Sequence, residues 1–148
     1  MLCYLQMQNY SNHTRLYPAH HFILTPIAVT ALVLALLLAG ESDSIGKQEI
    51  FNVLLASALI LTAFIARIYA IKNQNRIIRI EMRYRYFELT GKSFKEKESQ
   101  LTLSQIIALR FASDDELLQL IDKSITEKLS NKQIKQSINN WQADYKRV

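Results

Sequence analysis

The chain has 148 residues, with 18 Lys and Arg against 13 Asp and Glu and a formal net charge of +5. A single cysteine, Cys3, excludes an internal disulfide, and three glycines leave little room for a Gly-rich phosphate-binding loop. The residues that follow Ile71 suffice for one small domain at most.

Two apolar runs dominate the first half of the chain. Phe22–Ala39 contains no charged residue, and neither does Ile50–Ala66. A helix of about 20 apolar residues crosses the hydrocarbon core of a bilayer. The sequence therefore predicts a membrane hairpin over residues 22–71, with helices at about 22–39 and 50–71 and a loop at 40–49. Small residues in the second run, Ala56, Ser57, Ala63 and Ala66, favour close helix approach.

The charges that flank the runs predict the orientation of the hairpin. Residues 72–100 contain eight Lys and Arg against four Glu, whereas the loop at 40–49 contains one Lys. Basic flanks stay on the cytoplasmic side. We expect an inner-membrane protein with both termini in the cytoplasm, residues 1–21 as an N-terminal cytoplasmic segment, and the loop outside. A cleaved signal peptide is the alternative for the first run, which is long for such a peptide and has one basic residue before it.

Three histidines, His13, His20 and His21, precede or begin the first run. Imidazoles there could bind a transition metal or a haem. Adjacent histidines point apart on a helix, and no carboxylate precedes Glu41 to complete a ligand set. A role at the headgroup interface is the competing interpretation, and no cofactor is expected.

A long helix is predicted to continue from the second run to about Leu89, because no Gly or Pro occurs between Gly46 and Gly91. Arg67 is placed to reach the headgroups by snorkelling. Beyond it, basic residues form a ridge on the helix, and we assign them with Arg67 to lipid headgroup or partner contact: Lys72, Arg76, Arg79, Arg83 and Arg85.

Two apolar stripes flank this ridge. Ile71, Ile78, Met82 and Leu89 form one, and Ile77, Ile80, Tyr84 and Phe87 form the other. The stripes could pack on the C-terminal part of the chain or pair with another copy. The ridge itself could bind anionic headgroups, each residue contributing about 1 kcal/mol. RNA binding is the less favoured use, because no aromatic-rich RNA motif accompanies the ridge.

The C-terminal residues, 101–148, predict a small unit of three short helices after a polar connector that ends at Gln100. Three capping boxes mark the helix starts: Thr102–Gln105, Ser113–Glu116 and Ser130–Gln133. An amphipathic stretch follows each one, and Trp141 is the expected core anchor of the unit. The predicted fold class is therefore all-α: a membrane hairpin, a basic juxtamembrane helix and connector over 72–100, and a three-helix C-terminal unit.

Blocks along the chain resemble a family of small bacterial membrane proteins of unknown function, DUF6526. The blocks that carry the resemblance are Met7–Arg15, Tyr17-Pro18, His20–Phe22, Gln74–Arg79, Glu81–Arg83, Arg85-Tyr86, Leu89–Gly91, Ala108–Asp114, Trp141-Gln142 and Asp144-Tyr145. The resemblance implies a protein with two membrane helices and favours Met7 over Met1 as the start. It implies no activity, cofactor or site.

No set of nucleophile and base or of paired catalytic carboxylates occurs in a recognisable pattern, so we expect a non-enzymatic adaptor. Its hairpin would anchor a basic helical module that contacts anionic lipid, a protein partner or a second copy of the chain. A metal or haem protein that uses the histidines is the alternative, and an RNA-binding membrane protein is a further one.

Overall fold

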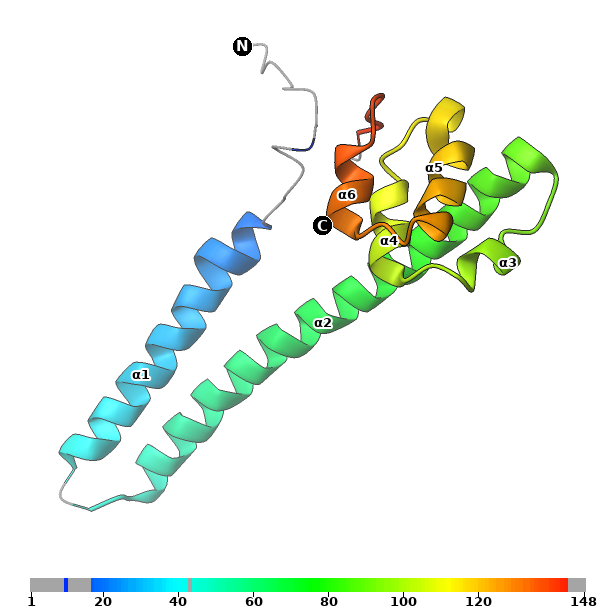
Figure 1. The fold of residues 1–148 in the computed structure, drawn as a ribbon. Coiled ribbons are helices and arrows are strands. Elements are labelled where there is room, and N and C mark those ends of the chain that lie inside the picture. The colour runs from blue at the N-terminus through cyan, green and yellow to red at the C-terminus, as the bar shows by residue number, and fades with distance from the viewer. Residues whose placement is uncertain (1–9, 11–16, 43, 144–148) are drawn as a thin grey trace, which may run out of the picture. The chain divides into compact units, whose positions relative to one another are not determined.

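The computed structural model describes Tyr10 and residues 17–42 and 44–143 of the protein. Within these residues every named secondary-structure element is a helix (Figure 1). This confirms the predicted all-α fold. The chain divides into two compact units at the Ile71–Lys72 junction. We call residues 17–71 the hairpin unit and residues 72–143 the C-terminal module. In chain order the helices are η1 (Ala19–Leu24), α1 (Thr25–Glu41), α2 (Lys47–Thr90), α3 (Lys95–Glu98), α4 (Leu103–Leu109), α5 (Asp114–Thr126) and α6 (Asn131–Gln136).

The first helix begins at Ala19 rather than at Phe22, and its first turns are a π-helix. The Thr25 amide donates to the His20 carbonyl, the wider spacing of a π turn, and the Thr25 hydroxyl donates to the same oxygen at 2.7 Å. Pro26 follows directly and has no amide hydrogen to donate, so a regular α-helical ladder could not continue through it. The proline at the start of α1 thus accounts for the change of helix type.

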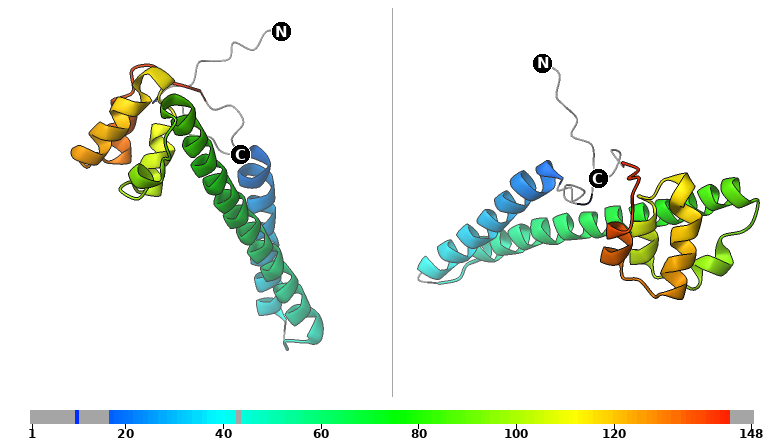
Figure 2. Two further views of the ribbon diagram at one scale, coloured as in Figure 1. Left: turned by 90° about the vertical axis from the view of Figure 1, so that its right-hand side faces the viewer. Right: turned by 45° about the horizontal axis from the view of Figure 1, so that its top comes forward.

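Small side chains form the contact inside the hairpin unit, where α1 lies beside the N-terminal half of α2 (Figure 2). The buried residues of this unit are four alanines: Ala28 and Ala35 on α1, and Ala56 and Ala63 on α2. Each pair is spaced by seven residues and so lies on one face of its helix. The close approach predicted for Ala56 and Ala63 therefore occurs between α1 and α2, whereas Ala66 is exposed.

Large apolar side chains point away from this contact. Most of the Leu, Ile, Val and Phe residues of α1 and of the N-terminal half of α2 are exposed, among them Leu38, Leu54 and Phe64. The segment Ala19–Glu41 has 23 residues and α2 has 44, and both are long and apolar enough to cross a membrane. The loop between them is shorter than predicted, because α1 extends to Glu41 and α2 begins at Lys47.

Helix α2 runs without interruption from Lys47 to Thr90, as the absence of Gly and Pro predicts. It ends at Gly91, whose φ of 68° lies in the left-handed region that glycine enters without a steric penalty. The Gly91 amide donates to the Phe87 carbonyl at 2.7 Å and closes the last turn. The predicted C-terminal stop is confirmed.

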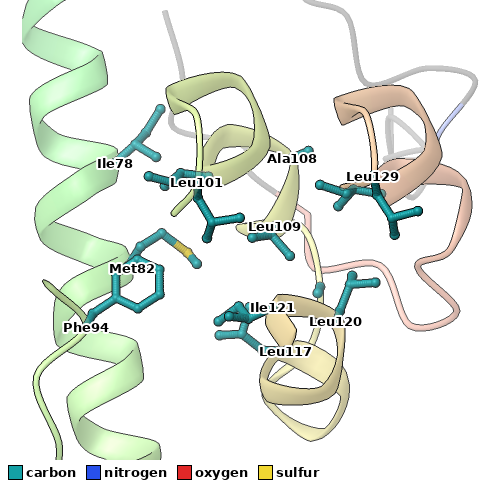
Figure 3. Close-up of a cluster of buried hydrophobic side chains, with 13 residues drawn as sticks. Ile78, Met82, Phe94, Leu101, Ala108, Leu109, Leu117, Leu120, Ile121 and Leu129 are labelled. Carbon is teal, nitrogen blue, oxygen red and sulfur yellow. The ribbon is translucent and has the colours of Figure 1, made fainter. Parts of the chain in front are cut away.

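A single hydrophobic core holds the C-terminal module together, and α2 contributes Ile78 and Met82 to it (Figure 3). Phe94, from the loop before α3, packs beside them and contacts the Tyr86 ring in a tilted arrangement with ring centroids 5.0 Å apart. The other members come from α4, α5, α6, the segments that connect them and the segment before α4: Leu101, Ile106, Ala108, Leu109, Ala112, Leu117, Leu120, Ile121, Leu129 and Ile134. Ile78 and Met82 of the first predicted stripe therefore pack on the C-terminal part, one of its two predicted uses, whereas Ile71 and Leu89 of the same stripe are exposed.

Two of the three predicted capping boxes are present. Thr102 and Gln105 satisfy each other's backbone amides at the start of α4, and Ser130 and Gln133 do so at α6. The connector also contains the short helix α3, which the sequence analysis did not predict.

The third capping box, at Ser113–Glu116, was predicted wrongly. Ser113 is the N-cap of α5, but its side chain makes no capping hydrogen bond. The Glu116 carboxylate instead accepts from the amides of Asn139 and Asn140, each at 3.1 Å. The Ser113 amide donates to the Asn140 carbonyl, and Gln142 donates to Phe111. The segment after α6 thus takes the Glu116 carboxylate that the capping box would have used. In the same segment, Trp141 stacks on Phe111 with ring centroids 4.7 Å apart.

Replacing Ile121 tests this core, since its side chain is fully buried. We expect Ile121→Ala to lower the free energy of unfolding of the C-terminal module by about 2–5 kcal/mol, because it leaves a cavity. Thermal unfolding of the full chain in detergent, followed by circular dichroism, measures this. Gln119→Ala on the exposed face of the same helix is the control and should change stability by less than about 0.5 kcal/mol. Equal effects of the two substitutions would contradict the assigned core.

Candidate functional site

The two groups of residues predicted to be functional lie in different units. His20, His21 and Arg67 belong to the hairpin unit, and Lys72, Arg76, Arg79, Arg83 and Arg85 belong to the C-terminal module. His13 lies outside the described residues. The two groups are therefore separate, each within its own unit.

A cavity of about 300 Å³ opens in the hairpin unit where η1 meets α2. His20, His21 and Arg67 line it together with apolar and small side chains, namely Ala28, Val29, Ile60, Ala63 and Phe64, and with Thr25. The cavity therefore combines an apolar wall with three nitrogen-bearing side chains. Such a combination suits an amphiphile, whose polar head and apolar tail need different surroundings.

The two histidine rings lie together rather than apart. Their centroids are 5.1 Å apart in an edge-to-face arrangement, and the π turn that carries both side chains departs from the α-helical spacing assumed in the prediction. His20 Nε2 lies 3.4 Å from the Ala63 carbonyl, and His21 Nδ1 lies 3.0 Å from the Tyr17 carbonyl. His20 Nδ1 is enclosed and makes no hydrogen bond to another described residue. No group of three His, Cys, Asp or Glu that could hold a metal occurs within the described residues.

Two of the predicted contact arginines, Arg79 and Arg83, bind a carboxylate of the chain itself. Arg83 donates from Nε to Glu98 Oε2 at 2.6 Å and from Nη2 to Oε1 at 3.1 Å, and Arg79 donates to Oε1 at 3.1 Å. The Glu98 side chain is buried, whereas both arginine side chains remain nearly half exposed. Arg83 therefore binds Glu98 in a bidentate manner, with two nitrogens on two carboxylate oxygens, which is the strong geometry for an arginine–carboxylate ion pair.

This arrangement shifts the acid–base equilibria of the residues involved. The hydrogen bond from Arg83 lowers the pKa of Glu98, the charges of Arg83 and Arg79 lower it further, and partial burial opposes them. The same hydrogen bond raises the pKa of Arg83. Glu98 is therefore ionised at neutral pH and fixes α3 against α2.

Arg85 connects α2 to the turn between α4 and α5. Its guanidinium donates to the carbonyls of Arg110 at 3.1 Å and Ala112 at 2.8 Å, and it pairs with Asp114 at 2.6 Å. The carbonyl of Arg110, at the C-terminal end of α4, thus receives a cationic donor. Arg85 is mostly buried. Its contacts in the described structure are internal to the C-terminal module.

Lys72 and Arg76 are exposed on α2. Arg76, a member of the predicted ridge, makes no ion pair with any described residue. The nearby Glu81, which is not part of the ridge, likewise makes none. The expectation that Lys72 and Arg76 contact headgroups or a partner therefore stays a prediction.

Sequence reasoning missed Glu98, Asp114 and Glu116 as partners within the chain. Phe94, Glu98 and Leu101 share the helical spacing of one apolar face, which could have marked Glu98 as a carboxylate turned toward the interior. No comparable local pattern marks Asp114 or Glu116, because their partners lie more than twenty residues away.

Removal of the Glu98 charge should weaken the C-terminal module. We expect Glu98→Gln to cost about 1 kcal/mol at neutral pH, a value kept low because both guanidiniums are partly exposed to solvent. Since the folded-state pKa lies below the ordinary one, this contribution is present above about pH 4.3 and disappears as the pH falls through the lowered pKa. Thermal unfolding of the two proteins should therefore differ at pH 7 and converge in acid.

Glu96→Gln is the matched control for this experiment, because Glu96 is exposed on the same short helix. It should leave the melting temperature unchanged at both pH values. A Glu98→Gln protein as stable as the parent at pH 7, or a difference that grows in acid, would contradict the assigned ion pair.

Comparison with known proteins identifies the family. A sequence model of DUF6526, a family of unknown function, matches residues 5–148, and the chain therefore belongs to this family. The resemblance that the sequence blocks indicated is confirmed. No curated protein and no solved structure matches the chain.

Proposed function

We propose that this member of the DUF6526 family is a non-enzymatic adaptor of the bacterial inner membrane. In this proposal α1 and the N-terminal half of α2 cross the bilayer, both termini and the C-terminal module lie in the cytoplasm, and Ser42–Gly46 faces the outside. The C-terminal module would then present its surface to protein partners or anionic lipid.

The observation that carries the membrane assignment is the composition of the contact between α1 and α2. Four alanines are buried there, while the large apolar side chains of both helices are exposed. In water such a surface would far exceed the few hundred Å² of contiguous apolar patch that soluble monomers expose. In a bilayer the same side chains meet hydrocarbon, and small residues at the helix contact are typical.

The adaptor role is supported by the independent core of the C-terminal module. Ile78 and Met82 of α2 belong to that core, and α2 is one continuous helix from Lys47 to Thr90. An anchor of this kind fixes the module at the membrane, where its basic residues meet anionic headgroups.

The cavity in the hairpin unit supports contact with a phosphate-bearing lipid. Arg67, a permanent cation, lines it beside His20 and His21, and Phe64 and Ile60 form an apolar wall. A basic pocket between membrane helices on the cytoplasmic side suits an anionic headgroup, with its acyl chain against the apolar wall.

RNA binding by Arg76, Arg79 and Arg83 is the weaker candidate, because Glu98 occupies two of the three guanidiniums. For metal or haem binding, His20 and His21 would need ligands from outside the described residues.

Membrane insertion and orientation are tested with single cysteines in a Cys3→Ser background. We expect Ser44→Cys to react with a membrane-impermeant maleimide in intact spheroplasts, and Gln119→Cys to react only after permeabilisation. The chain should also stay in the membrane fraction through an alkaline carbonate wash. Release into the aqueous fraction would contradict the anchor, and labelling of Gln119→Cys from outside would contradict the orientation.

The adaptor role is tested by photo-crosslinking in living cells, with the crosslinker placed at Lys132 or Asp115 on the exposed surface of the C-terminal module. We expect one defined protein to be captured, and capture to be lost when the module is destabilised by Ile121→Ala. The same crosslinker in the external loop, at Ser44, is the control. Identical sets of abundant membrane neighbours at all three positions would contradict an adaptor.

A further inference from the structure

The second predicted stripe of α2 remains uncovered. Ile77, Ile80, Tyr84 and Phe87 are 55%, 61%, 62% and 57% exposed, although each is a large apolar or aromatic side chain. All four lie in the C-terminal module, beyond the apolar run that precedes Arg67. Side chains of this size in one row are typical of a surface that another chain covers.

The stripe is part of a sequence repeat of seven residues. Arg76–Met82 reads RIIRIEM and Arg83–Leu89 reads RYRYFEL. Arginine opens each copy, an apolar residue stands second and fifth, glutamate stands sixth, and Met or Leu closes it. In coiled-coil notation the arginines occupy g, Ile77 and Tyr84 occupy a, Ile80 and Phe87 occupy d, and Glu81 and Glu88 occupy e.

Apart from Arg83 at g, which binds Glu98, the α2 residues that bind the C-terminal module lie outside this seam. Met82 stands at f, directly opposite the a and d positions, and its side chain points into the module core (Figure 3). Ile78 and Arg85 stand at b, and both also contact the module. A second helix can therefore lie against a and d without displacing α4, α5 or α6.

We propose that the residues at a and d form the seam of a parallel two-stranded coiled coil with a second copy of this chain. The charges beside the seam select this occupant. In a parallel pair, g of one helix faces e of the next heptad on the other helix. Arg76 then faces Glu81 of the second copy, and Arg83, which already binds Glu98 of its own chain, lies opposite Glu88. Because the pairing is reciprocal, each contact occurs twice in a two-fold dimer.

A parallel arrangement follows from membrane anchoring, so this inference rests on the proposed function. Two copies inserted with the same orientation carry their α2 helices in the same direction. Two heptads alone make a short seam, but α2 is already helical in each copy, which removes most of the cost of ordering it. Confinement to one membrane raises the effective concentration of the second copy.

Disulfide formation between single cysteines, in the full chain with Cys3→Ser, tests the seam in membranes. We expect Ile80→Cys and Phe87→Cys to form a crosslinked dimer under mild oxidation. Leu89→Cys is the matched control, because this f residue is also exposed on α2 but lies away from the seam. It should remain monomeric. Equal crosslinking at all three positions, or none at the two seam positions, would overturn the proposal.

Reversal of charge tests the register separately from the fold. Arg76 and Glu81 are the suitable pair, since Arg83 is already bound to Glu98. We expect Arg76→Glu and Glu81→Arg each to reduce crosslinking at Ile80→Cys several-fold, and the two together to restore it. A double substitution that crosslinks no better than either single one would overturn the parallel register.

If lipid or another protein covered the seam, the crosslinking results would differ. Seam cysteines that are shielded from an aqueous maleimide yet form no dimer would assign the stripe to lipid or to another protein, and would overturn pairing between copies. The mass of the detergent-solubilised chain should correspond to two copies. Three or four copies, which isoleucine at both a and d can favour, would also overturn it.

The anchor and the seam fail in distinguishable ways. A chain that stays in carbonate-washed membranes without seam crosslinks refutes the coiled coil and leaves the anchor intact. A chain that washes into the aqueous fraction refutes the anchor, and the parallel coiled coil that depends on it falls as well.

Discussion

Everything in the C-terminal module depends on how the faces of α2 are divided. The single helix α2 presents several stripes of side chains, and a stripe that packs against the module core is not available to another partner. Ile78 and Met82 are covered by the module core, and Arg79 and Arg83 hold Glu98 at the edge of that contact. The side opposite Met82 is left with an exposed row of apolar residues between arginines and glutamates.

The division of the α2 faces also gives the residues of the basic ridge different roles. Its arginines are not equivalent: Arg85 satisfies the end of α4 and pairs with Asp114, whereas Arg76 extends from an exposed surface. Substituting all of them at once would therefore confuse loss of the fold with loss of binding. The Glu98 carboxylate binds both Arg79 and Arg83 and so partly offsets their charge beside the packed face of α2.

Different physics holds the hairpin unit. Its two helices meet through alanines, so little apolar surface is buried between them and most of it faces outward. In water this would be an unstable arrangement, and in hydrocarbon it is the expected one, because lipid replaces the protein core as the environment of the large side chains. The two ends of the α2 helix therefore differ: the large apolar side chains of the N-terminal half are exposed, whereas Ile78 and Met82 near the other end are buried in a protein core.

The sequence by itself determined what depends on neighbours along the chain. Run length predicted the two apolar helices, the absence of Gly and Pro predicted the continuity of α2, and Gly91 predicted its end. The capping boxes at Thr102 and Ser130 join residues three positions apart, and both are present. Contacts between distant segments were decided by the tertiary structure: Glu116 binds Asn139 and Asn140 rather than its own helix start, and Arg79, Arg83 and Arg85 turn toward Glu98 and the end of α4. Helical periodicity places side chains on a face, but only folding brings up the partner that covers it. Only the tertiary structure could therefore decide that Ile78 and Met82 are buried while Ile77 and Ile80 remain exposed.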